Sequence, residues 1–275
     1  MSTNFSGRRT SSSPPPSPET DWQRYGRYLW LGLLLIVLGG GIAAAHSYFF
    51  SGGYGSWAAV VVAGDWRAHD GSSSEIFDNA RRDVSAALVK IGFKPEHVLQ
   101  FSVRPERYPG THPFNSDADS ISASLAALAG HERAGCLLYF SSHGAPSGLL
   151  LGERILAPSE LEGMVTSACG DRPTIVVISA CYSGVFVPAL QAPNRMIVTA
   201  ARPDRTSFRC GGTNKYPYFD ACFLSSIGAA ADFEELAHRT KDCVAQTEQQ
   251  TGMSPPSDPQ IFIGSGIAQH LPAWG

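Results

Sequence analysis

The feature that most constrains this chain is a pair of uncharged apolar segments, each ending in small residues and one reactive side chain. Residues 136–144 end with His143 and a glycine, and residues 174–184 deliver Cys181 and then a glycine. Such segments are typical of strands buried on both faces of a parallel sheet. In open α/β sheets, ligands bind just beyond the carboxyl ends of the strands. We therefore expect an imidazole and a thiol in one crevice, where a cysteine nucleophile would have a histidine acid/base beside it.

Strand-like and helix-like segments alternate along the rest of the chain. Strands are predicted over residues 57–63, 97–103, 136–143, 174–181 and 196–201, and helices over residues 75–91, 116–129, 158–167 and 233–249. Residues 216–231 are predicted to begin as a loop and become helical. Residues 149–156 predict a small hairpin, and residues 260–263 an edge strand or a packing arm. This alternation predicts an α/β fold with a mostly parallel sheet.

The first fifty residues differ in composition from the remainder. Residues 1–28 are rich in Ser and Pro and lack a core-forming pattern, so we expect a disordered tail. Residues 29–50 are apolar over a length that spans a bilayer, with an aromatic residue near each end, and predict one transmembrane helix. A cleaved signal peptide, with Ala43–Ala45 as its cleavage site, is the alternative. Residues 51–275 would then form the folded domain.

Charge gives the expected orientation of this segment. Four arginines and two acidic residues precede it, a balance of +2 in a chain whose formal net charge is −3. Because positive residues stay on the cytoplasmic side, we expect a single-pass protein of the inner (cell) membrane with a cytoplasmic N-terminus. The folded domain would be periplasmic or otherwise extracytoplasmic. A mildly acidic domain offers no basic surface for nucleic acid.

Six cysteines fit an oxidising compartment, where disulfides persist. With Cys181 as a nucleophile, five remain. Cys136 begins a core strand and is expected to pack as a small buried hydrophobe. Disulfides are expected among the others, with the pairing open: Cys169, Cys210, Cys222 and Cys243. No spacing of Cys or His fits a structural zinc, and thiol–imidazole chemistry needs no cofactor.

The two strand ends resemble those of the legumain-type cysteine peptidases, family C13 of the caspase-like clan. Residues 57–64 are similar to the first strand of that family and residues 79–92 to its first helix. Residues 196–207 are similar to the strand and loop that wall its specificity pocket. The resemblance covers roughly residues 57–232. It implies a caspase-like three-layer sandwich, here of a bacterial membrane-anchored type.

The resemblance also implies roles for three residues. Cys181 would be the nucleophile, placed at a strand-to-helix turn where a helix N-terminus favours the thiolate. His143 would be the acid/base, since imidazole titrates near neutral pH. The backbone N–H groups of Gly144 and Cys181 would form the oxyanion hole.

The expected substrate pocket departs from the family in two places. Asp220 falls where the family has an acidic residue of its P1 pocket, with Ser179 and Arg205 as expected neighbours. Tyr182 stands directly after the nucleophile, where legumains have an acidic residue. Their Asn-x-Arg-His pattern is absent between residues 64 and 79. An acidic pocket floor without that arginine would favour Arg or Lys at P1 over the Asn of legumains.

Together these features predict a membrane-anchored cysteine endopeptidase that hydrolyses protein or peptide substrates through an acyl-enzyme. A peptide transamidase or ligase of the same family is an alternative, since water or an amine can attack the acyl-enzyme. A catalytically silent caspase-like binding module is another. The presence of both His143 and Cys181 argues against the silent module, because binding alone requires neither.

Overall fold

The computed structural model describes residues 53–130, 134–208 and 214–274. The predicted tail (1–28) and the predicted membrane segment (29–50) lie outside these residues. Within them, no helix combines the length and the apolar character that crossing a bilayer requires.

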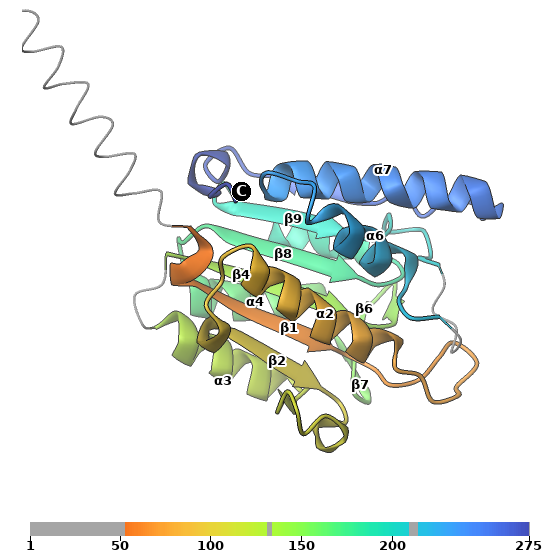
Figure 1. Ribbon diagram of the computed structural model, residues 1–275, viewed down its shortest axis with the longest axis horizontal. Helices are drawn as coiled ribbons and strands as arrows, with labels where there is room; N and C mark the ends of the chain where they lie inside the picture. The colour runs from red at the N-terminus through yellow and green to blue at the C-terminus, as the bar shows by residue number, and fades with distance from the viewer. Residues whose placement is uncertain (1–52, 131–133, 209–213, 275) are drawn as a thin grey trace, which may run out of the picture. The chain divides into compact units, whose positions relative to one another are not determined.

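A seven-stranded sheet forms the centre of the domain (Figure 1), in the order β10-β9-β8-β4-β1-β2-β3. All neighbouring strands are parallel except β9 and β10, which are antiparallel. Every residue of the three central strands is buried, as their uncharged sequences predict. The strands are β1 (Trp57–Ala63), β2 (Val98–Ser102), β3 (Phe114–Asn115), β4 (Gly135–Ser141), β8 (Thr174–Ser179), β9 (Arg195–Thr199) and β10 (Gln260–Ile263).

Helices cover both faces of the sheet and complete three layers (Figure 1). One apolar cluster joins alternate strand residues to α2 (Ile76–Lys90), α6 (Tyr218–Ser226) and α7 (Phe233–Thr251). The other strand residues pack against α3 (Ala118–Ala129), α4 (Pro158–Cys169) and α5 (Val187–Leu190). The predicted three-layer α/β sandwich with a mostly parallel sheet is confirmed.

Helix ends follow from local chemistry. The Asp117 carboxylate accepts a hydrogen bond from the Ser120 N–H, so α3 begins at residue 118 and not at the predicted 116. Asp232 caps α7 in the same way through the Glu235 N–H. Gly92, with φ of +114°, follows the end of α2 in a conformation that glycine adopts without strain.

A second, smaller sheet follows β4 directly. Its antiparallel strands are β5 (Gly144–Ala145), β6 (Gly148–Leu151) and β7 (Arg154–Leu156). The predicted hairpin is β6 and β7, and β5 pairs with β6. The chain immediately after His143 is therefore held in a sheet.

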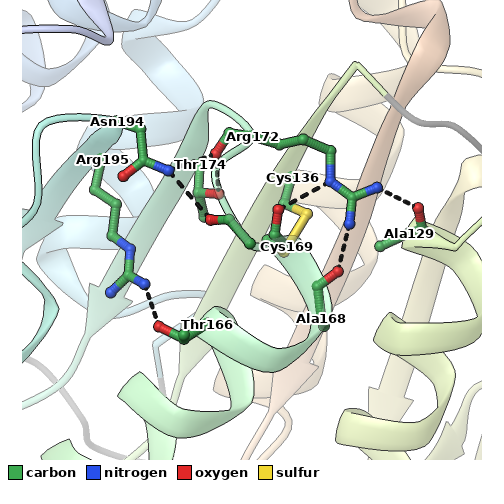
Figure 2. Close-up of a disulfide and its surroundings, with 10 residues drawn as sticks. Ala129, Cys136, Thr166, Ala168, Cys169, Arg172, Thr174, Asn194 and Arg195 are labelled. Carbon is green, nitrogen blue, oxygen red and sulfur yellow. Dashed lines mark hydrogen bonds between the residues drawn. A yellow bond between two sulfur atoms is a disulfide. The ribbon is translucent and has the colours of Figure 1, made fainter.

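Two disulfides cross-link the domain, one between a strand and a helix and one between two helices. Cys136, at the amino end of β4, is bonded to Cys169, the last residue of α4, with a Cα–Cα distance of 6.2 Å (Figure 2). The expectation that Cys136 packs as a buried thiol is wrong, because the end of α4 lies over the start of β4. The second disulfide joins Cys222 of α6 to Cys243 of α7, and both of these cysteines are among those expected to form bridges. Cys210 lies outside the described residues.

Candidate functional site

The carboxyl ends of β4 and β8 bring His143 and Cys181 to the same place. Ser141 and Ser179 are Cα partners, the last pair of the β4–β8 ladder. His143 and Cys181 each follow two residues later. Strand side chains alternate between faces, so both residues continue the positions that face α2, α6 and α7. The predicted meeting of an imidazole and a thiol at one sheet edge therefore follows from the strand register.

His143 is held by the loop that follows β1. Its Nε2 lies 2.9 Å from the backbone oxygen of Arg67. The ring of Phe77 packs against the imidazole in an edge-to-face contact at 5.0 Å between centroids, and the ring of His69 lies 6.3 Å away. A carbonyl oxygen only accepts, so Nε2 must carry the proton in the neutral ring. Nδ1 is then the nitrogen with a lone pair, ready to take a proton.

Cys181 is partly exposed and is the one described cysteine outside the two disulfides. The Ser207 N–H donates to its sulfur at 3.3 Å, and the Ser207 carbonyl lies 3.5 Å from the same atom. A backbone N–H directed at the sulfur favours the thiolate, whereas the carbonyl accepts from the protonated thiol. The loop after β9 thus offers the sulfur an acceptor for the protonated thiol and a donor for the thiolate.

The helical segment expected directly after Cys181 is short. A 3₁₀ turn covers Ser183–Phe186 and α5 adds only four residues. So short a segment has few aligned peptide dipoles to favour a thiolate. The expected helix-dipole effect stays a prediction, and the Ser207 N–H is a donor that the structure places at the sulfur.

Gly144 lies against the backbone of Cys181. A Cβ on Gly144 would stand 2.0 Å from the Cys181 carbonyl oxygen and 3.0 Å from the Cβ of Ala180. No side chain fits at this position. The two residues expected to supply oxyanion-hole N–H groups are thus in contact through their backbones.

The turn that carries Cys181 is docked on the loop after β9. Tyr182 has φ of +57°, a left-handed conformation, and its N–H donates to the Arg205 carbonyl at 2.7 Å. Ser183 Oγ accepts from the Ala201 N–H at 3.1 Å. The Arg205 guanidinium pairs with its neighbour Asp204 at 2.6 Å. Two predicted pocket residues, Tyr182 and Arg205, are therefore adjacent.

Asp220 and Ser179 are also brought together, but beneath the surface. Asp220 is 0 % exposed. Its carboxylate accepts from Tyr139 Oη at 2.5 Å, Ser141 Oγ at 3.0 Å and Ser179 Oγ at 2.7 Å. Burial raises the pKa of Asp220 to about 6, against the opposing effect of these hydroxyls. Contact between Asp220 and a substrate side chain stays a prediction.

Sequence reasoning missed several residues around the site, chiefly those of the loop after β1. Asp65 is buried, and its carboxylate accepts from the backbone N–H groups of Trp66 and Arg67 and from Arg67 Nε. These bonds shape the loop that presents the Arg67 carbonyl to His143. The sequence did carry one signal for this loop: it is polar and directly follows the carboxyl end of a buried strand, where ligands bind in open α/β sheets.

In the described part of the chain, His, Cys, Asp and Glu side chains form no group able to hold a metal ion.

Comparison with known proteins places the site in a wider context. A sequence model of the peptidase C13 family matches residues 70–253, which include His143, Cys181 and Asp220. No curated protein sequence matches the chain. Among solved structures, the fold is similar to the crystal structure of caspase-1 from Spodoptera frugiperda, with a TM-score of 0.55 and 16 % sequence identity. That likeness covers 77 % of this chain and 87 % of the caspase chain.

Proposed function

This chain belongs to the peptidase C13 family, and from that premise we propose that it is a cysteine endopeptidase working through Cys181 and His143. The observation that carries the proposal is the β4–β8 register, whose last pair, Ser141 and Ser179, lies two residues before His143 and Cys181. The hydrogen bond from His143 Nε2 to the Arg67 carbonyl supports it, because that bond leaves Nδ1 as the base.

The proposed reaction begins when His143 Nδ1 takes the thiol proton. The sulfur then attacks the peptide carbonyl carbon, and the negative charge that forms on the oxygen is received by the N–H groups of Gly144 and Cys181. As the C–N bond breaks, His143 returns the proton to the leaving amine and a thioester remains. Water, losing a proton to His143, then attacks the thioester; the acid leaves, and His143 returns the proton to the sulfur to restore the thiol.

The Arg67 carbonyl has a further part in this cycle. When the imidazole is protonated at both nitrogens, the Nε2–H continues to donate to the carbonyl oxygen. The ring therefore need not turn between the acid and the base steps. Phe77, which is buried, restricts the other side of the ring. Such orientation is part of what makes a positioned base effective.

We also propose that residues 29–50 anchor the protein in the inner (cell) membrane, with the peptidase domain outside the cytoplasm. The two disulfides support this location, because structural disulfides persist in oxidising compartments. Alkaline extraction of membranes from cells that express the full chain tests the anchor: retention in the pellet is expected. Protease added to intact, wall-stripped cells should degrade the domain, and full protection of the domain would contradict this topology.

Cleavage of a mixed peptide library by the full chain, purified in mild detergent, tests the peptidase proposal. Cys181→Ala and His143→Ala are the matched variants, with products read by mass spectrometry. Cleavage by the wild type alone is expected, and the P1 residue is read from the products: Asn, or Arg and Lys. Cleavage that persists in Cys181→Ala would contradict the assigned nucleophile. Adding hydroxylamine separates transfer to an amine from hydrolysis, since a transamidase would form hydroxamates.

A further inference from the structure

We propose that Asp220 is a positioning residue, a buried link that holds the ends of β4 and β8 together directly beneath His143 and Cys181. The inference rests on the proposed peptidase function and adds to it a residue that sets the spacing of the thiol and the imidazole. This proposal replaces the predicted contact between Asp220 and a substrate side chain, because the carboxylate is fully buried: Asp220 would act through the strands.

The geometry places this link at the last point where the two strands are paired. Oδ2 of Asp220 accepts from both Ser141 Oγ, at 3.0 Å, and Ser179 Oγ, at 2.7 Å. These serines are the last Cα partners of the ladder, and each precedes its catalytic residue by two positions. A shift of either strand end would therefore lengthen or break one of the two bonds.

The third hydrogen bond fixes the orientation of the carboxylate. Tyr139 lies on the same strand as Ser141, and its Oη donates to Asp220 Oδ1 at a distance of 2.5 Å. The Tyr139 hydroxyl is fully buried, which keeps it neutral, since burial and the nearby Asp220 raise its pKa. Three hydroxyl donors thus converge on a group that, when ionised, can only accept. Among the described residues, no salt bridge reaches Asp220, so the three hydroxyls and the N–H of Asp220 itself are what stabilise its charge.

The carboxylate comes from a third element that is itself firmly held. Asp220 lies in the first turn of α6, between the buried Phe219 and Phe223. Two residues further on, Cys222 is bonded to Cys243 of α7. Helix α6 therefore presents the carboxylate from a fixed position, and the strand ends are aligned against it.

The expected consequence is a loss of rate without a matching loss of binding. A displacement of about 1 Å at a catalytic group can lower a rate by about 100-fold. For Asp220→Asn we expect kcat to fall at least 10-fold with KM within 3-fold of the wild type. Ser141→Ala and Ser179→Ala should each lower kcat less. Neither serine change should lower it further in the Asp220→Asn background, because all three act through one link.

A second readout does not depend on peptidase activity. Native Cys181 should react with iodoacetamide near neutral pH at a rate that reflects its pairing with His143. Asp220→Asn should slow this labelling at least 5-fold, toward the rate of His143→Ala. If no peptide is ever cleaved, the proposed function fails, while the labelling rates still test whether Asp220 positions the thiol.

Thr174→Val is the matched control. The Thr174 hydroxyl is a buried donor on β8, bonded to the Arg172 carbonyl at the opposite end of the strand (Figure 2). The Thr174→Val substitution should leave kcat and the labelling rate within 2-fold of the wild type. If Asp220→Asn does not fold, the two serine variants carry the same test. Unchanged kcat and labelling in the Asp220 or serine variants would overturn the proposal. So would a changed P1 preference in Asp220→Asn, which would make Asp220 a substrate contact.

Discussion

Gly144 and Cys181 are in backbone contact across the gap between two strand ends. The position that a Gly144 side chain would occupy is 2.0 Å from the Cys181 carbonyl oxygen. The β5–β6 ladder holds Gly144 from one side, and the Tyr182 N–H, bonded to Arg205, holds the Cys181 turn from the other. The proposed oxyanion-hole donors are thus fixed by backbone contacts, as electrostatic preorganisation requires.

Gly144→Ala should strongly lower the rate of peptide cleavage. Its methyl group must push the Cys181 backbone away, which misplaces both N–H donors. Loss of one oxyanion donor typically costs about 100- to 1,000-fold in kcat, and we expect a fall of about that size. Steady-state kinetics on one cleaved peptide provide the measurement.

Gly163→Ala is the control for that substitution. Gly163 lies inside α4, and a Cβ there would meet nothing within 4 Å. Alanine is favoured over glycine in a helix by about 1 kcal/mol, so this variant should be slightly more stable and equally active. Equal loss of activity in both variants would mean that the effect at Gly144 is not local.

The sheet, and the meeting of His143 and Cys181 at its edge, were predictable because both depend on short stretches of sequence. Residues 174–179 form an uncharged apolar run, and such a run predicts a buried strand without reference to the rest of the chain. Parallel strands end at one edge, so His143 and Cys181 were expected there together.

The contacts that complete the site were not predictable in the same way, since they join distant positions. His143 and Arg67 are 76 residues apart, and Tyr139 and Asp220 are 81 apart. No local pattern links such pairs. Asp220 was expected in a pocket through family resemblance alone, and its complete burial appears only when α6 is packed on the sheet.

Cys136 is a second case in which a contact between distant positions could not be predicted from local sequence. An apolar strand explains a buried cysteine equally well as a thiol or as half of a disulfide. The difference depends on where α4 ends, which is set by packing between α4 and the sheet.

Both disulfides should stabilise the domain by similar amounts. The bridged residues are separated by 33 positions for Cys136–Cys169 and by 21 for Cys222–Cys243. The loop-closure estimate gives about 3–4 kcal/mol for either length. Urea unfolding of the variants Cys136→Ala/Cys169→Ala and Cys222→Ala/Cys243→Ala measures the loss. Peptide mapping after native alkylation checks the pairing: labelling of any of these four cysteines in the wild type would contradict it.

Arg172→Ala should lower stability while leaving catalysis intact. The guanidinium donates to the carbonyl groups of Ala168 and Cys169 at the end of α4 and of Ala129 at the end of α3 (Figure 2). Hydrogen bonds to charged groups contribute about 1.5–3 kcal/mol, and loss of this set should lower the unfolding free energy by at least that amount. Because these contacts lie at the amino edge of the sheet, kcat should remain within 2-fold of the wild type. A large fall in kcat for the folded variant would contradict this separation of the two edges.

Asp220 should make the domain less stable as pH rises. Its pKa is raised by burial from 3.8 to about 6 in the folded protein. Well below pH 3.8 the carboxyl is protonated in both states, and its full contribution to stability is present. As pH rises through 6, the unfolded chain has already ionised while the folded protein must ionise at a cost. The loss integrates to about 3 kcal/mol and is complete near pH 7.

The comparison with Asp220→Asn isolates this effect, since the amide does not titrate. The free energy of unfolding of the wild type minus that of Asp220→Asn should fall by about 2 kcal/mol between pH 4 and pH 7, because the carboxyl of the unfolded chain is already partly ionised at pH 4. Urea titrations of both proteins across this range measure the difference, and all other titrating groups cancel in it. A difference independent of pH would mean that burial does not raise the pKa of Asp220. The expected fall would mean that the site retains an ionised carboxylate at a cost in stability, as is common for groups kept for function.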